Sequence, residues 1–69
     1  MNNSPSKQFI HKIQLLESGQ SETAILSKYD ALFIIEIFLK NKDIKFEVEF
    51  SHVDKFSKMA EYKITATKN

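Results

Sequence analysis

The side chains that could do chemistry are few and scattered along the sequence. There are two histidines, His11 and His52, and no cysteine. His52 precedes Asp54 by two residues, so both would share one face of an extended strand. A catalytic or metal-binding role needs further groups that converge on the histidine, and the sequence offers none. We expect His52 to be a surface histidine beside a carboxylate, and we predict no catalytic residue, metal site or cofactor.

Motifs for nucleophilic catalysis or phosphate binding are missing as well. No Gly-x-Ser-x-Gly segment occurs, and Gly19 is the sole glycine, which excludes a glycine-rich phosphate loop. Ser27 has the sequence context of a helix cap rather than of a nucleophile. Glu47 and Glu49 alternate with Lys45 along a predicted strand, where pairing with lysines of a neighbouring strand explains them. These features predict a protein that is not an enzyme.

Charge argues against nucleic acid as the main partner. Ten lysines and no arginine stand against nine carboxylates, giving a formal net charge of +1. Arginine is the residue that makes two-pronged contacts to phosphate and guanine, and none is available. Three strand aromatics could stack on bases, but they share the apolar face that a helix should cover: Phe46, Phe50 and Tyr62. We therefore do not expect nucleic acid as the partner, and a weak single-stranded nucleic-acid-binding module is the alternative function.

The length of 69 residues indicates a single small domain. We expect residues 1–7 to form a flexible N-terminus and residues 8–69 to form the domain. The polar start has no signal-peptide core and no apolar run could span a membrane, so the expected location is cytoplasmic and no membrane partner is expected. A core of this size rarely supplies more than about 3–5 kcal/mol of net stability. Binding to itself or to a partner would add to that.

Three elements are predicted clearly. A central helix follows Ser27, whose hydroxyl and the nearby Asp30 form a capping pattern, and it runs toward Lys42. Strict alternation predicts strands over Ile44–Val53 and Glu61–Thr67. Each strand is apolar on one side only, which indicates an antiparallel sheet with one solvated face.

The segment Phe9–Glu17 (FIHKIQLLE) fits two structures. With a period of two it is a strand that forms a hairpin with the short apolar run 23–26. With the helical period it is a first helix, capped by Ser4 with Pro5 at its first position. The fold class is α+β in both cases, with one central helix packed on a small antiparallel sheet. The element order is ββαββ, or αβαββ if this segment is helical.

The central helix has more apolar surface than one sheet should cover. One broad arc is expected to face the sheet and comprises Ala31, Leu32, Ile34, Ile35, Phe38 and Leu39. A second stripe of Tyr29, Phe33 and Ile37, flanked by Glu36 and Lys40, would be polar on a helix that only covers a sheet. The N-terminal segment could cover this stripe, or the stripe could be a protein interface, or it could be ordinary scatter of exposed apolar residues.

Together these features favour a small non-enzymatic protein-binding or regulatory protein. Its partner would be another protein, a second copy in a homodimer, or both. Lysine without arginine, with abundant Asn, Ile and Phe, is typical of AT-rich coding, as in phages and low-GC bacteria. A phage or bacterial accessory or inhibitor protein fits that composition. The candidate interface residues are Tyr29, Phe33, Ile37, Glu36 and Lys40.

Overall fold

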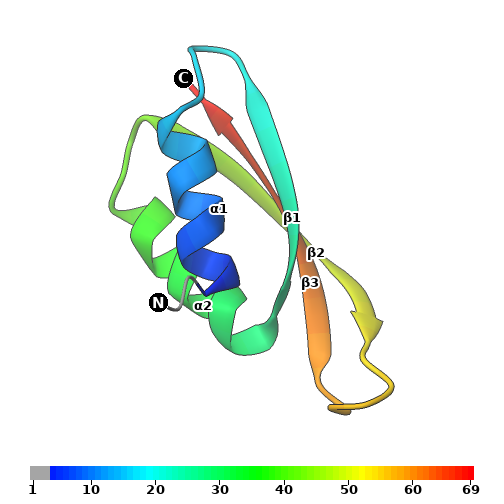
Figure 1. Ribbon diagram of the computed structural model, residues 1–69. Coiled ribbons are helices and arrows are strands. Elements are labelled where there is room, and N and C mark those ends of the chain that lie inside the picture. The colour runs from blue at the N-terminus through cyan, green and yellow to red at the C-terminus, as the bar shows by residue number, and fades with distance from the viewer. Residues whose placement is uncertain (1–3) are drawn as a thin grey trace.

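A computed structural model gives the structure of the chain and describes residues 4–69. The elements follow in the order α1 (Pro5–Gln14), β1 (Ser21–Ser27), α2 (Lys28–Leu39), β2 (Ile44–Val53) and β3 (Ala60–Lys68). Figure 1 shows the two helices lying together on one side of a twisted sheet. The α+β class is confirmed.

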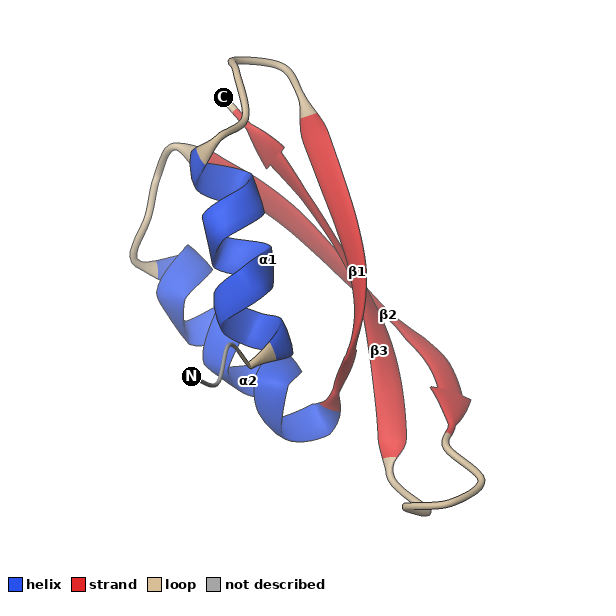
Figure 2. Ribbon diagram, viewed as in Figure 1, coloured by secondary structure: helices blue, strands red, loops and turns tan. Residues whose placement is uncertain are grey.

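The sheet has three strands in the order β1-β3-β2, and β3 is antiparallel to both neighbours. β1 and β2 therefore run parallel to each other with β3 between them. Figure 2 shows both helices on the same face, so within residues 4–69 no helix lies on the other face of the sheet. Pairing of Glu49 with Lys63 across that open face, at 3.7 Å, confirms the expected cross-strand ion pair. The predicted sheet with one solvated face is present.

The first segment is a helix, so the order ββαββ is wrong and the alternative order αβαββ is observed. Ser4 caps α1 by accepting a hydrogen bond from the Lys7 backbone N–H at 3.3 Å, and Pro5 occupies the first helical position. Phe9 and Ile13, four residues apart, are both buried against the rest of the fold. A strand here would have buried His11 between them on the same face, and burying that polar ring without a partner is costly.

The helix also begins earlier than the predicted domain boundary. Pro5, Ser6 and Lys7 were assigned to the flexible N-terminus, but they form the first turn of α1. Ser6 is buried, and its hydroxyl lies 3.0 Å from that of Ser4. The cap at Ser4 is the physical reason, since it supplies acceptors to the first turn. The rest of the predicted N-terminal segment, residues 1–3, lies outside the described residues.

The remaining elements lie close to their predicted bounds. Ser27 caps α2, accepting from the Asp30 backbone N–H at 3.4 Å, and its hydroxyl donates to the Asp30 carboxylate at 3.2 Å. The helix ends at Leu39 with Lys40 as its C-cap, shorter than the predicted run to Lys42. β2 has the predicted bounds, and β3 is one residue longer at each end than predicted.

The core lies between the helices and the sheet. Its buried apolar side chains are Phe9, Ile13, Leu26, Ala31, Ile34, Phe38, Ile64 and Ala66. α1, α2, β1 and β3 each contribute to this set, whereas β2 contributes none; its Ile44 and Phe46 pack only partly against the core. The strand at one edge of the sheet is therefore the least covered part of the fold.

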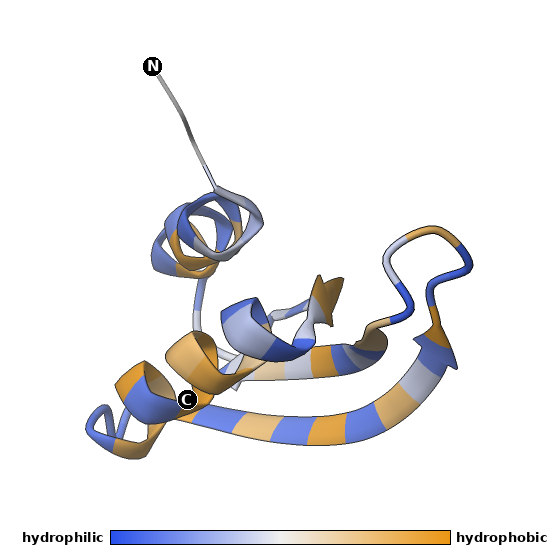
Figure 3. Cartoon of the chain, turned by 90° about the horizontal axis from the view of Figure 1, so that it is seen from below, coloured by the Kyte–Doolittle hydropathy of each residue, from blue (hydrophilic) through white to orange (hydrophobic). Residues whose placement is uncertain are grey.

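A difference in length explains why β2 is poorly covered. A helix of 12 residues such as α2 spans about 18 Å, whereas a strand of 10 residues such as β2 spans about 33 Å. The β2–β3 hairpin must therefore extend beyond the helices. Figure 3 shows this arrangement, with β2 as a long curved strand of alternating hydropathy that continues past the helices to the hairpin loop.

Candidate protein interface

The outer face of α2 carries the predicted stripe. Tyr29 is 71% exposed and Phe33 is 47% exposed, and they lie one helical turn apart. Glu36 and Lys40 are exposed beside them. Ile37 is partly buried and packs against the core, so it is only at the edge of this surface. Residues four apart rotate by about 40° around a helix, and this rotation carries the stripe from solvent at Tyr29 toward the core at Ile37.

Packing against the core thus covers only the Ile37 end of the stripe. Phe9 of α1 packs against Phe38 of α2, with ring centroids 6.2 Å apart. Ile10 and Ile37 are both partly buried at the core beside this pair. Tyr29 and Phe33, nearer the start of α2, remain exposed. We call the surface formed by Tyr29, Phe33, Glu36 and Lys40 the α2 outer face.

Two residues of the predicted sheet-facing arc are exposed instead. Leu32 is half exposed and Leu39 is 71% exposed, which corrects the expectation that packing on the sheet buries both. The reason is the packing of α1 beside α2. Because α2 packs against both α1 and the sheet, its buried side is the one that carries Ile34 and Phe38. Leu32 and Leu39 are thereby turned out of the core.

Leu32 borders a groove that was not predicted from the sequence. The groove lies between α2 and the extended hairpin, with a volume of about 220 Å³, and is lined by Lys28, Ala31, Leu32, Ile35, Val48 and Tyr62. Beyond it, Phe50 is 60% exposed and meets Tyr62 edge to face at 6.0 Å. The sequence could have indicated this groove, because the predicted strand is longer than the predicted helix can cover.

The hairpin loop presents another exposed aromatic side chain, Phe56, which is 96% exposed. The loop is held by Asp54, whose carboxylate accepts hydrogen bonds from the backbone N–H groups of Phe56 at 3.1 Å and Ser57 at 2.8 Å. The Asp54 N–H donates to the Met59 carbonyl at 2.9 Å. Phe56 is therefore displayed on an ordered turn.

The hydrogen bonds of this turn lower the pKa of Asp54 below its ordinary value of 3.8; the Ser57 N–H has the largest effect, followed by the Ser57 hydroxyl. A carboxyl group with a lowered pKa stabilises the folded loop above the ordinary value, and this contribution is lost as the pH falls through the lowered pKa. We expect the amide resonances of Phe56 and Ser57 to shift with a midpoint below 3.8 in an NMR titration. In Asp54→Asn, which keeps an acceptor but not the charge, that transition should disappear; its persistence would contradict the assignment.

His52 does lie beside a carboxylate, but the partner is Glu61 rather than Asp54. A register shift after Phe50 places His52 opposite Glu61, and its Nε2 lies 3.6 Å from the Glu61 carboxylate. The Ser51 hydroxyl is 2.9 Å from Nδ1 of His52. Both His52 and Glu61 are open to solvent, which weakens such a pair. Within residues 4–69, no cluster of three metal-binding side chains occurs.

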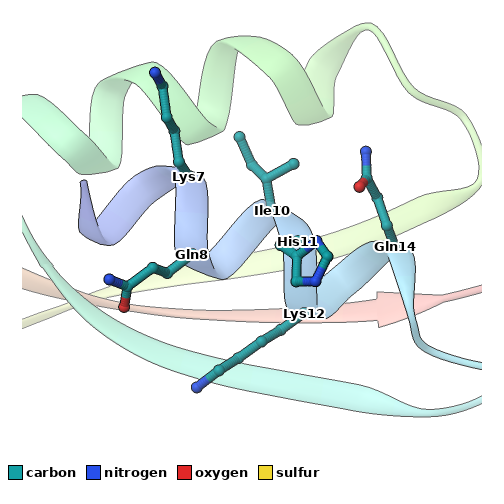
Figure 4. A pocket seen from close by; sticks show the side chains of 6 residues that line it. All are labelled: Lys7, Gln8, Ile10, His11, Lys12 and Gln14. Carbon is teal, nitrogen blue, oxygen red and sulfur yellow. The ribbon is translucent and has the colours of Figure 1, made fainter. Parts of the chain in front are cut away.

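A broad, open hollow lies along the outer side of α1, with a volume of about 530 Å³. Its lining residues are Lys7, Gln8, Ile10, His11, Lys12 and Gln14. Figure 4 shows these side chains spreading apart, with Lys7 and Lys12 pointing in opposite directions, so they do not converge on a common point. The exposed apolar surface on α2 and the hairpin is the better candidate site.

Comparison with protein-family models, with curated proteins and with solved structures found no match for this chain. Its function is therefore inferred from the chemistry of its own surface.

Proposed function

We propose that this chain is a small non-enzymatic protein-binding or regulatory protein that acts through contact between the α2 outer face and another protein. The supporting observation is the pair Tyr29 and Phe33, exposed together on a helix whose other side is buried. A helix that only covers a sheet is polar on its solvent side. Tyr and Phe are enriched at the centres of protein interfaces, with charged residues such as Glu36 and Lys40 at the rim.

The biological setting we propose is the cytoplasm of a bacterium, where the chain would be a bacterial or phage accessory or inhibitor protein. This proposal is supported by the lysine-rich, arginine-free composition. Among the helices of the described chain, none has both the length and the apolar character needed to cross a membrane.

The positions of the strand aromatics favour a protein partner over nucleic acid. Phe46 packs against Phe38 at 5.5 Å, on the side of the sheet that the helices cover. On the opposite side, β2 presents Lys45, Glu47 and Glu49, so the carboxylates outnumber the lysine there. Carboxylates repel the phosphate backbone, which supplies most of the affinity in nucleic-acid binding.

The substitution Phe33→Lys tests the proposed contact. A photo-reactive cross-linker placed at Tyr29 in the full chain should form one dominant adduct with a protein in the bacterial cytoplasm. We expect Phe33→Lys to reduce this adduct at least tenfold, because interface aromatics commonly contribute about 2 kcal/mol or more to binding. The yield is measured by mass spectrometry, which also separates an adduct with a second copy from one with a different protein.

A cross-linker at Gln14, on the outer side of α1, is the matched control and should not give the same adduct. Phe33→Lys should also keep the circular dichroism spectrum of the parent chain, since this side chain is partly exposed. An unfolded variant would assign Phe33 to the core. A folded variant that forms the adduct in full would rule out the α2 outer face as the contact.

A further inference from the structure

The strand β2 has one side without a neighbour. It lies at the edge of the sheet, and its first seven residues, 44–50, pair with β3 without interruption. The Asn69 N–H donates to the Asp43 carbonyl at 2.8 Å, so the odd-numbered positions of this strand bond to β3. In an antiparallel ladder the alternate residues point their backbone groups the other way. The N–H and C=O groups of Phe46, Val48 and Phe50 are therefore directed to the open edge.

This edge lacks most of the features that prevent edge pairing. Natural proteins protect an edge strand with proline, with short length, with bulges or with inward-pointing charge. β2 has no proline, its inward residues are all apolar, and its register shift comes only after Phe50. A hollow of about 580 Å³ lies against its first half, lined by Ile44, Lys45, Phe46, Glu47, Thr65 and Thr67.

Exposed apolar side chains gather on the same side of the molecule. Val48 and Phe50 of β2 are exposed, and Leu32 of α2 lines the groove described above together with Val48. The other edge strand, β1, differs, because α1 packs beside it and its Leu26 is buried. β2 is therefore the edge at which an added strand would cover apolar surface.

We infer that β2 pairs with β2 of a second copy of this chain, antiparallel and centred on Phe46, to form a continuous six-stranded sheet. In this register Lys45 lies opposite the partner's Glu47, and Glu47 lies opposite the partner's Lys45. Neither residue takes part in an ion pair within residues 4–69. These positions are the non-hydrogen-bonded pairs of the new ladder, where facing side chains are closest.

Within β2, residues 44–53, the register centred on Phe46 sets opposite charges against each other and places no like charges together. Centring the pair on Lys45 would place two lysines opposite each other, and centring it on Glu47 would place two glutamates together. Centring it on Val48 would set Glu47 against the partner's Glu49. Because one strand carries both signs on either side of Phe46, it is complementary to itself, which favours a second copy over an unrelated strand.

The dimer extends beyond the proposed function because it uses a different surface. The α2 outer face, including Tyr29 and Phe33, is not part of the β2 contact. Failure of the dimer would leave the proposed contact at Tyr29 and Phe33 intact, and failure of that contact would leave the dimer intact. The two proposals are tested by different variants.

The test uses charge exchange and measures mass by light scattering over a concentration series. We expect the parent chain to have twice its monomer mass at high concentration. Glu47→Lys should raise the dissociation constant at least tenfold by placing lysines opposite each other. The double variant Lys45→Glu with Glu47→Lys should return the dissociation constant to within about threefold of the parent value, since the ion pairs reform with exchanged signs. Glu17→Lys makes the same charge change in an exposed loop and should have no effect.

Because the chain has no cysteine, disulfide trapping can test the register directly. Lys45→Cys and Glu47→Cys chains carrying different tags are mixed and oxidised. The mixed dimer should dominate, because residues 45 and 47 face each other within disulfide reach, whereas two copies of residue 45 are about 8 Å apart. A parent chain that stays monomeric, or a mixed species that makes up no more than the statistical half of the cross-linked product, would overturn the inference.

Discussion

Ile34→Ala should remove most of the free energy of unfolding of the chain. Ile34 has no exposed surface and lies on the side of α2 that is enclosed by α1 and the sheet. Truncating a buried isoleucine to alanine costs about 2–5 kcal/mol, because apolar burial is lost and a cavity remains. A core of this size rarely supplies more than about 3–5 kcal/mol of net stability, so one such change removes most of it. Urea denaturation followed by circular dichroism measures the loss.

Ile25→Ala provides the matched control for Ile34→Ala. It makes the same chemical change on the open face of the sheet, where Ile25 is half exposed. Its cost should be below about 1 kcal/mol, as for most exposed positions. If Ile34→Ala proved as stable as Ile25→Ala, the position of Ile34 at the centre of the core would be wrong.

Phe9→Ala should have an effect of similar size, and it tests whether α1 belongs to the folding unit. Phe9 is buried and contacts Phe38. Removing a buried phenylalanine side chain costs about 3–5 kcal/mol. Since α1 contributes Phe9 and Ile13 to the core, we expect helix and sheet to be lost in one cooperative transition. Circular dichroism and amide hydrogen exchange of β3 should report the same midpoint.

His11→Ala is the control on the same helix, at an exposed position, and should leave the midpoint nearly unchanged. If Phe9→Ala removed helical signal while β3 kept its protection from exchange, α1 would be an attached helix rather than part of the core.

The sequence predicted those elements whose local signals agree with one another. Ser27 caps α2 as expected, because a hydroxyl before an apolar helical run satisfies its first N–H groups. β2 has the predicted bounds Ile44–Val53, because seven consecutive residues alternate strictly and Asn41, Lys42 and Asp43 precede them. At such positions, neighbouring residues determine the structure.

The first segment could not be decided from local signals. Phe9, Ile13 and their neighbours satisfy both a helical and an alternating pattern, so the choice depends on what the rest of the chain provides. The Phe38 ring gives α1 an aromatic surface to pack on, and β3 gives β1 a strand to pair with. Both are distant in the sequence, which is why a local pattern cannot reveal them.

The candidate site was predicted in part for the same reason. Tyr29 and Phe33 are exposed as a stripe on α2, where the helical period places them. The prediction that Leu32 and Leu39 are buried against the sheet was wrong, because it took the sheet to be the only neighbour of α2. Phe56 was not identified as a displayed side chain, since the turn that presents it depends on hydrogen bonds to Asp54.

The position of β3 determines when the sheet can form during synthesis. This strand is the middle of the sheet, yet it leaves the ribosome after both strands with which it pairs. Ser21 and Thr67, which share a hydrogen bond, are 46 residues apart, and closing such distant pairs is slow. Until β3 appears, β1 and β2 have no strand to pair with, and their apolar faces are exposed to aggregation or to chaperones. The nascent chain is thus at its most vulnerable just before its last strand appears.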